Sequence, residues 1–188
     1  MSESLTVRKN FLPEAEADEL AKLYETAVDW KTEKQTFVYG GSHLSRDGGK
    51  YQGFVASKLP SDGESYYACF DQSLALAQHP SVLAAVAKIG GTTHRCYRMG
   101  PGQGFRVHVD DYFSGRFSHV LYLNRSWVWD WGGLLHVVSA DGESGSVVFP
   151  EFNTLATMDY AEKKVPHFAS FITSWARLPR YVLAIFGG

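Results

Sequence analysis

Hydrophobic positions in the first part of the chain follow a helical period. Leu20, Leu23, Tyr24 and Ala27 are spaced i, i+3, i+4 and i+7, which places them on one face of a helix. Pro13 suits the first turn of this helix, and acidic residues crowd that turn as the helix dipole favours. The pattern therefore predicts an amphipathic helix that packs against another element.

A second helix is predicted from about residue 71 to residue 88, with a break near His79 and Pro80. The glycine pair at 90–91 is expected to end it. Between the two helices, residues 31–66 are polar and glycine-rich and show no clear period. We expect one or two short strands with loops there, and loops of this kind often contact a substrate.

From Thr92 onward the pattern is that of short strands separated by turn residues. The apolar or alternating runs are 93–99, 105–109, 117–123, 134–138, 146–149, 154–158, 166–173 and 180–186. Eight such runs after two helices predict an α+β, mainly β fold: a double-stranded β-helix, or jelly roll, with N-terminal supporting helices. We expect one domain over residues 1–188, with helices in about 13–90 and the β core in about 92–187.

Composition narrows the class of protein. The chain has 188 residues, 45% of them hydrophobic, which is enough for one ordinary core. The net charge of -2 gives no overall basic field for nucleic acid. Two cysteines, Cys69 and Cys96, suit a reducing compartment. With no long apolar run, we expect a cytoplasmic protein with no membrane partner.

The tripeptide His108-Val109-Asp110 is the strongest chemical signal within the β region. Side chains at i and i+2 of a strand point to the same face, so this imidazole and carboxylate can bind one metal ion. Two histidines and one carboxylate on one face form the ligand set of non-haem Fe(II) oxygenases. Alone the tripeptide is weak, because a surface histidine near an acid also produces it.

Five blocks in order strengthen this interpretation. The segment CYRMGPGQGFRVHVD resembles the tyrosine, glycine-turn and His-x-Asp block of the prolyl 4-hydroxylase-like Fe(II)/2-oxoglutarate oxygenases. GRFSHVLYLNRSW resembles the next strand of that family, and WDWGGLLHVV its Gly-Gly hairpin. VVFPEFNTLATMDY resembles the following strand pair, and VPHFAS with LPRYVLAIF the closing histidine and arginine.

The resemblance implies the functional residues at the matching positions. His108, Asp110 and His167 would be the iron ligands, and Arg180 would pair with the distal carboxylate of 2-oxoglutarate. Arg177 lies in the same loop and is the alternative for that carboxylate. Because Asp110 is present, the halogenases of the family, which replace this carboxylate by a small residue, are not the expected relatives.

Three further residues are expected near the cosubstrate. Tyr122 matches the family tyrosine that hydrogen-bonds the same carboxylate, although in an apolar strand it can also be a core residue. Tyr97 matches a tyrosine near the cosubstrate or substrate. His119 stands where relatives often carry a threonine, and it either lines the cosubstrate pocket or is a buried, hydrogen-bonded histidine.

By resemblance the protein is an Fe(II)- and 2-oxoglutarate-dependent dioxygenase that uses O2, with ascorbate as a supporting reductant. It would hydroxylate an unactivated C–H bond of a prolyl or other amino-acid residue, in a peptide, in a protein or as a free amino acid, and release succinate and CO2. The substrate walls are expected in residues 31–66 and at Trp127, Trp129 and Trp131, which can equally be packing anchors. The sequence does not define an oligomeric state.

Two other functions use the same residues. A jelly-roll binding module keeps the fold without the chemistry, but has no reason to retain the three metal ligands and Arg180. A zinc hydrolase also uses two histidines and an aspartate with an open position. Zinc alone does not explain Arg180 and Tyr122, so metal content and cosubstrate dependence separate these possibilities.

Overall fold

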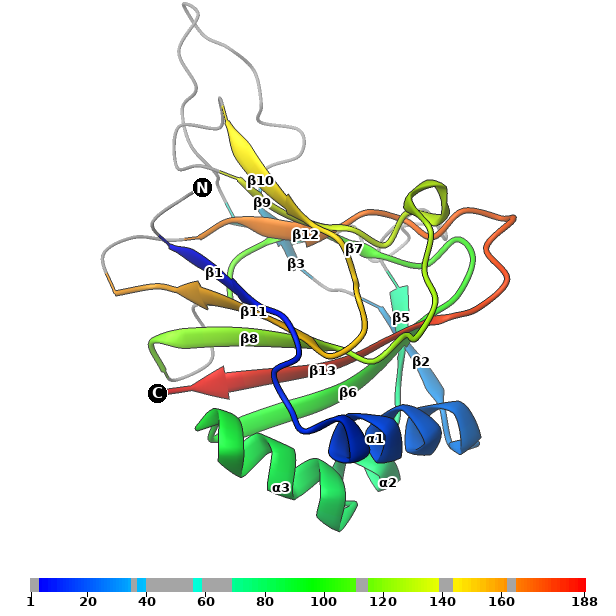
Figure 1. The fold of residues 1–188 in the computed structure, drawn as a ribbon. Helices are drawn as coiled ribbons and strands as arrows, with labels where there is room; N and C mark the ends of the chain where they lie inside the picture. The colour runs from blue at the N-terminus through cyan, green and yellow to red at the C-terminus, as the bar shows by residue number, and fades with distance from the viewer. Residues whose placement is uncertain are drawn as a thin grey trace, which may run out of the picture.

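The computed structural model describes residues 4–34, 37–39, 56–58, 69–110, 115–138, 144–161 and 165–188 (Figure 1). Much of the glycine-rich region lies outside these ranges. The described parts of it contain three short strands: β2 (Lys31–Lys34), β3 (Phe37–Tyr39) and β4 (Ala56–Lys58). The last two pair with each other as a two-stranded sheet. Whether this region contacts a substrate stays a prediction.

The first helix forms as predicted, and the second is divided. Helix α1 (Glu14–Thr26) buries the apolar face that contains Leu20 and Tyr24. Residues 71–72 belong to strand β5 (Cys69–Gln72), so the helical region begins later than expected, at α2 (Leu74–Ala77). His79 then caps α3 (Pro80–Ile89) by accepting a hydrogen bond from the Ser81 amide. At the predicted break, α2 therefore ends completely and α3 begins with a proline in its first turn.

Two antiparallel sheets form the core, as the predicted jelly roll requires. The larger has seven strands in the order β1, β11, β8, β13, β6, β5, β2 and the smaller has four in the order β10, β9, β12, β7. The strands not yet given are β1 (Leu5–Arg8), β6 (Thr93–Met99), β7 (Phe105–His108), β8 (Phe117–Tyr122), β9 (Leu135–Val138), β10 (Gly145–Val148), β11 (Thr154–Asp159), β12 (His167–Ala169) and β13 (Arg180–Gly187). All eight runs predicted after Thr92 contain a strand. Strand β1, which pairs with β11, was not predicted.

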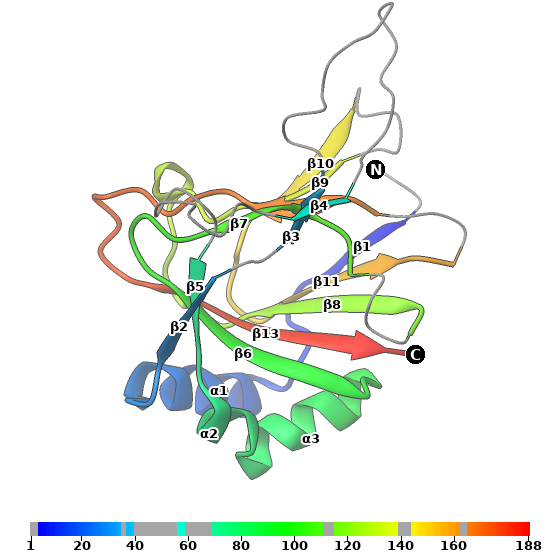
Figure 2. The same cartoon turned by 180° about the vertical axis from the view of Figure 1, so that it is seen from behind.

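The larger sheet has two differently packed faces. Figures 1 and 2 show α1 and α3 on one side of this sheet and the smaller sheet on the other. We call the side toward the smaller sheet the inner face and the side toward the helices the outer face. Alternation along β8 sends Tyr122 into the inner hydrophobic cluster and Leu121 into the outer one. Among the helices in the described ranges, none has the length and apolarity needed to cross a membrane.

Candidate metal centre

Three predicted ligands meet between the two sheets. His108 ends β7 and is the direct cross-strand partner of His167 on β12, while Asp110 follows two residues after His108. The ligand atoms of these residues lie within 4.8 Å of one another. His167 Nε2 is 3.3 Å and His108 Nε2 3.6 Å from the Asp110 carboxylate oxygens. The strand pairing thus brings His167 to His108 and Asp110, which lie 59 and 57 positions earlier in the chain.

Hydrogen bonds orient each of these side chains. The Nδ1 atom of His108 lies 2.7 Å from the Arg106 carbonyl oxygen, and that of His167 lies 2.9 Å from the Val165 carbonyl oxygen. A proton on Nδ1 satisfies these bonds and leaves a lone pair on each Nε2, the arrangement that metal-binding histidines use. Ser118 on β8 donates a hydrogen bond of 2.7 Å to Asp110 Oδ2. The donor atoms are therefore held in ligand-ready positions.

The electrostatics of the cluster favour a cation. Burial, together with neighbouring His167, lowers the pKa of His108 to about 4, so its imidazole is neutral at pH 7. Burial opposes ionisation of Asp110, but the two histidines and Ser118 outweigh it and lower its pKa to about 2. Two imidazole nitrogens and one carboxylate oxygen match the protein donor set of a non-haem Fe(II) site. The residues present fit an iron ion.

A buried arginine without an acidic partner lies beyond the metal ligands. Arg180 begins β13 and is only 3% exposed. Within the described ranges, its Nε atom has no hydrogen-bond partner, and its Nη1 atom makes a weak contact of 4.0 Å with Met99 Sδ. A guanidinium keeps its charge even when burial lowers its pKa. An uncompensated buried charge lowers the stability of the folded protein. We therefore expect an anionic ligand beside Arg180.

Tyr122 lies beside this arginine. The guanidinium carbon of Arg180 is 5.0 Å from the centroid of the Tyr122 ring. The ring is fully buried, and among the described residues the hydroxyl has no hydrogen-bond partner. Burial raises the pKa of Tyr122, so the hydroxyl is protonated and available as a donor. A buried guanidinium beside a buried phenol suits a carboxylate, as expected for 2-oxoglutarate.

Tyr97 lies on the same inner face, and the ring of Phe105 lies between it and the metal ligand His108. It is a cross-strand neighbour of Val182, and its ring packs edge-on against Phe70 and Phe105. The Phe105 ring in turn lies 5.6 Å from the His108 ring. Tyr97 thus helps to form an aromatic wall beside the metal site, and a direct contact with cosubstrate or substrate stays a prediction.

His119 lies on the opposite face of β8 from Tyr122. It lies three positions before Tyr122 on β8, so strand alternation turns its side chain to the outer face. There its Nδ1 atom is 2.9 Å from Thr157 Oγ1, and the side chain is buried. This placement agrees with the alternative of a buried, hydrogen-bonded histidine, and a role of His119 in cosubstrate binding stays a prediction.

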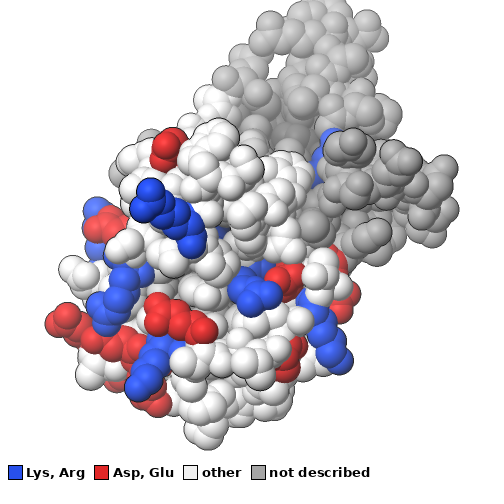
Figure 3. All heavy atoms as spheres, turned by 90° about the vertical axis from the view of Figure 1, so that its right-hand side faces the viewer, with Lys and Arg blue, Asp and Glu red and all other residues white. Residues whose placement is uncertain are grey.

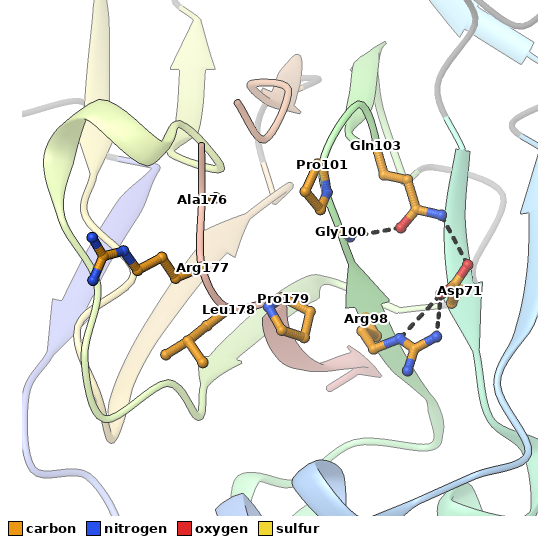
Figure 4. Close-up of a pocket in the computed structure, with 9 residues that line it drawn as sticks. All are labelled: Asp71, Arg98, Gly100, Pro101, Gln103, Ala176, Arg177, Leu178 and Pro179. Carbon is orange, nitrogen blue, oxygen red and sulfur yellow. Dashed lines mark hydrogen bonds and ion pairs between the residues drawn. The ribbon is translucent and has the colours of Figure 1, made fainter. Parts of the chain in front are cut away.

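Arg177 is also separated from the metal site. It is exposed and lines a pocket of about 340 Å³ with residues of β5, β6 and the 176–179 loop. Figure 4 shows its side chain extending away from Asp71 and Arg98 on the other wall of that pocket. Of the two candidate arginines, only Arg180 is buried on the inner face.

The tryptophans of the hairpin were expected to be either substrate contacts or packing anchors, and their surroundings differ. Trp127 is buried, donates a hydrogen bond of 2.9 Å to the Gly132 carbonyl oxygen, and packs edge-on against Trp131. Trp129 is 63% exposed and stacks on Phe149. Trp127 is therefore a packing anchor, whereas the exposed ring of Trp129 can contact a ligand.

Two positioning residues were missed in the sequence analysis. Ser118 donates a hydrogen bond to Asp110, and the Asn124 side chain bonds the backbone on both sides of Arg180. Asn124 Nδ2 donates to the Pro179 carbonyl oxygen, while its Oδ1 accepts from the Tyr181 amide, both at 2.7 Å. The Tyr-Leu-Asn sequence carried the signal for Asn124, but nothing in the sequence singled out Ser118.

Charged residues are mixed on the face shown in Figure 3. Lysine and arginine side chains lie among aspartate and glutamate there rather than gathering into one basic patch on the described part of that face. This agrees with the net charge of -2. The expectation that nucleic acid is not a partner stays a prediction.

Comparison with known proteins gives the class. A family model described as the 2OG-Fe(II) oxygenase superfamily matches residues 94–187, half of the chain. The chain therefore belongs to that superfamily, and it is an Fe(II)- and 2-oxoglutarate-dependent dioxygenase that uses O2. A comparison with curated protein sequences finds no match.

Solved structures of prolyl hydroxylases share the fold. A prolyl-4-hydroxylase from Pseudomonas putida is 18% identical with a TM-score of 0.59, over 97% of this chain and 91% of that one. A Trichoplax adhaerens prolyl hydroxylase in complex with a hypoxia inducible factor peptide fragment is 16% identical with a TM-score of 0.60, over 97% and 82%. A viral collagen prolyl hydroxylase from Paramecium Bursaria Chlorella virus-1, in a 2OG complex, is 11% identical with a TM-score of 0.51, over 97% and 94%. The jelly-roll prediction is confirmed.

Proposed function

We propose that this dioxygenase hydroxylates an unactivated C–H bond of a prolyl or other amino-acid residue, in a peptide or protein or as a free amino acid. One observation carries the proposal: a His-Asp-His cluster lies in the same inter-sheet space as a buried arginine that has no acidic partner among the described residues. A metal centre alone explains the first feature, and the carboxylate of a bound cosubstrate would explain the second. The fold shared with prolyl hydroxylases favours the amino-acid substrate class.

Each ligand residue has a defined task. His108 and His167 present Nε2 to the iron because their Nδ1 atoms are held by the carbonyls of Arg106 and Val165. Asp110 supplies the negative charge that stabilises a divalent cation, and Ser118 fixes the plane of its carboxylate. An iron ion held by these three residues would keep coordination positions for the cosubstrate and O2.

Arg180 and Tyr122 are assigned to the distal carboxylate of 2-oxoglutarate. The planar guanidinium can donate two parallel hydrogen bonds, and the phenol can donate a third. The apolar side chains around them, such as Met99 and Trp127, keep water out of the pocket and strengthen these bonds. The pocket thereby orients the 2-oxo acid end of the cosubstrate toward the metal ligands.

When bound, Fe(II) with 2-oxoglutarate and O2 supplies an oxidant that converts a C–H bond to C–OH while 2-oxoglutarate becomes succinate and CO2. One oxygen atom enters the product and the other enters succinate, so the reaction needs no further reductant in each turnover. The role of the protein is to hold the substrate carbon beside the metal and to exclude competing reactions. The aromatic wall of Tyr97, Phe70 and Phe105 is one side of that space.

The test is an assay of the Fe(II)-loaded protein with 2-oxoglutarate, O2 and a panel of prolyl peptides, other peptides and free amino acids. We expect succinate in equal amount to a product that is 16 Da heavier, and loss of both in Asp110→Ala. Products that form equally well without 2-oxoglutarate, or with zinc in place of iron, would instead indicate a hydrolase. Tight 2-oxoglutarate binding with no product from any substrate would favour the binding module.

A further inference from the structure

Three buried polar groups of the inner face have no hydrogen-bond partner among the residues that the structure describes. They are the Tyr122 hydroxyl, the Arg180 Nε and the Thr154 hydroxyl. The first two belong to the cosubstrate pocket proposed above. Thr154 is 1% exposed, and the proposed function gives it no role. A buried hydroxyl without a partner costs stability, so its presence requires an explanation.

Strand register places Thr154 beside the other two groups. Thr154 begins β11 and is the direct cross-strand partner of Tyr122 on β8. Tyr122 is in turn the partner of Val182 on β13, two positions after Arg180. Directly opposed residues share a face, with Cβ atoms about 5 Å apart, and residues two apart on a strand also share one. Thr154, Tyr122 and Arg180 therefore point into one region of the inner face.

The backbone that carries Thr154 is firmly held. The preceding residue, Asn153, is buried, accepts a hydrogen bond from the Leu12 amide and donates one to the Leu12 carbonyl oxygen. Its own amide bonds to the Tyr122 carbonyl oxygen at 2.9 Å. Thr154 thus stands at a fixed position, and rotation of its side chain is the only freedom its hydroxyl has.

A valine of the same shape would fill this position without the cost of an unpaired hydroxyl. The hydroxyl is therefore useful only if a bound ligand supplies the hydrogen-bond acceptor. The carboxylate assigned to Arg180 and Tyr122 is such an acceptor, because its two oxygens offer about four lone-pair positions. Donors on adjacent strands can therefore reach the same carboxylate from different sides.

Resting on the proposed function, we propose that Thr154 donates a hydrogen bond to the distal carboxylate of 2-oxoglutarate and helps to select 2-oxo acids that carry this carboxylate. Thr154 is then a binding and specificity-determining residue rather than a catalytic one. The ligand-free protein keeps an unsatisfied hydroxyl, and the cosubstrate satisfies it. The unpaired hydroxyl thus raises the affinity for the cosubstrate and lowers the stability of the ligand-free protein.

Thr154→Val tests this in two independent measurements. Anaerobic titrations of the Fe(II) protein are expected to show a 2-oxoglutarate Kd raised about tenfold, the loss of one hydrogen bond to a charged group. Binding of 2-oxobutyrate, which lacks the distal carboxylate, should not change. The melting temperature of the ligand-free, metal-free variant should equal or exceed that of the wild type. Thr154→Ser should retain the affinity for 2-oxoglutarate.

Thr157→Val is the matched control on the same strand. Thr157 faces the outer side and bonds His119, so its loss is expected to lower the melting temperature and leave the 2-oxoglutarate Kd unchanged. An unchanged Kd in Thr154→Val, or a lowered ligand-free melting temperature, would overturn this inference alone. Failure of the wild-type Fe(II) protein to bind 2-oxoglutarate would overturn the proposed function and this inference with it.

Discussion

Two arginines at the same end of the larger sheet have opposite surroundings. Arg98 on β6 pairs with Tyr181 across the strands, and Arg180 pairs with Met99, so the two arginines occupy adjacent positions on opposite faces. Arg98 donates bonds of 3.0 and 2.6 Å to Asp71 Oδ2 and lies over the Trp30 ring. Arg180, more deeply buried, has no acidic partner in the described parts of the chain.

The acidic partner of Arg98 is itself fully engaged. Asp71 Oδ1 accepts further bonds of 2.8 Å from Gln103 Nε2, as Figure 4 shows, and from Thr32 Oγ1. This network borders a pocket, but none of these bonds calls for a ligand. The partners of an arginine near a pocket therefore decide how it is interpreted. Arg98 is bonded within the fold, whereas the lack of an acidic partner of Arg180 among the described residues supports its proposed role in binding the cosubstrate.

Replacing each arginine by methionine should give opposite results. In Arg180→Met we expect the Kd for 2-oxoglutarate to rise at least about 100-fold, because a buried charge-assisted pair is lost. The ligand-free protein should unfold at the same or a higher temperature, since a costly buried charge has gone. In Arg98→Met the Kd should stay within about twofold and the melting temperature should fall, because Asp71 loses its cation. Thermal unfolding with and without 2-oxoglutarate measures both.

The distinction between the two arginines is wrong if Arg180→Met strongly lowers the melting temperature of the ligand-free protein and Arg98→Met does not. That pattern would make Arg180 the structural residue of the two. Circular dichroism of both variants shows whether either has lost its fold.

Asp71→Asn should lower the free energy of unfolding by about 1–3 kcal/mol at pH 7, the usual cost of disrupting a buried charged hydrogen-bond network. Burial opposes ionisation of Asp71, but bonds from Gln103, Arg98 and Thr32 outweigh it and lower its pKa below 3.8. The stabilisation is thus complete above pH 3.8 and lost as pH falls through the folded-state pKa. The free energies of unfolding of wild type and variant in urea titrations should differ at pH 7 and converge as the pH falls below 3.8. A difference independent of pH would contradict the role of the carboxylate.

Gly133→Ala should weaken cosubstrate binding through Arg180. A Cβ at Gly133 would lie 2.9 Å from Arg180 Cδ and 2.5 Å from Ile172 Cδ1, and its φ of +66° is already unfavourable for alanine. We expect a rise of about tenfold in the 2-oxoglutarate Kd, with lower stability from backbone strain. Calorimetric titration of the Fe(II) protein measures the first effect and urea unfolding the second.

Gly90→Ala separates the effect of backbone strain from the effect of the steric clash with Arg180. Gly90 ends α3 with φ +94°, and a Cβ there meets nothing within 4 Å. It should lose about 1 kcal/mol of stability without a change in Kd. Equal changes of Kd in the two glycine variants would show that strain, rather than displacement of Arg180, is responsible.

Asn124→Asp should have the smallest effect. The aspartate keeps an acceptor for the Tyr181 amide but loses the donor to the Pro179 carbonyl oxygen, so one of the two bonds that bracket Arg180 is lost. We expect about a threefold rise in the 2-oxoglutarate Kd and a stability loss of about 1 kcal/mol. Equilibrium titration resolves this change, and an unchanged Kd would indicate that β13 alone positions Arg180.

The strands and metal ligands were predictable because they depend on local signals. Alternation and turn residues located every strand after Thr92, and His108 with Asp110 needs only the i, i+2 geometry of a strand. The same alternation already places His119 and Tyr122 on opposite faces of the sheet, whereas the expected role of His119 in cosubstrate binding came from its position in the family pattern. Strand β1 was missed because its identity depends on pairing with β11, far along the chain.

The roles of Ser118, Thr154 and Arg98 depend on contacts that sequence does not display. Ser118 meets Asp110 only because two sheets face each other. Thr154 stands opposite Tyr122 through strand register, and Arg98 is distinguished from Arg180 by the face it occupies. Hydrogen-bond satisfaction is a property of the packed structure, and it is this property that separates structural from ligand-binding groups.

An anaerobic titration of the metal-stripped protein with Fe(II) and 2-oxoglutarate tests the central claim most directly. The His-Asp-His cluster and Arg180 should together hold iron and cosubstrate, giving a weak visible charge-transfer band that requires both components and is absent in Arg180→Met. Succinate should form when O2 is admitted. Tight metal binding with no band, and no effect of 2-oxoglutarate on melting temperature, would contradict the account.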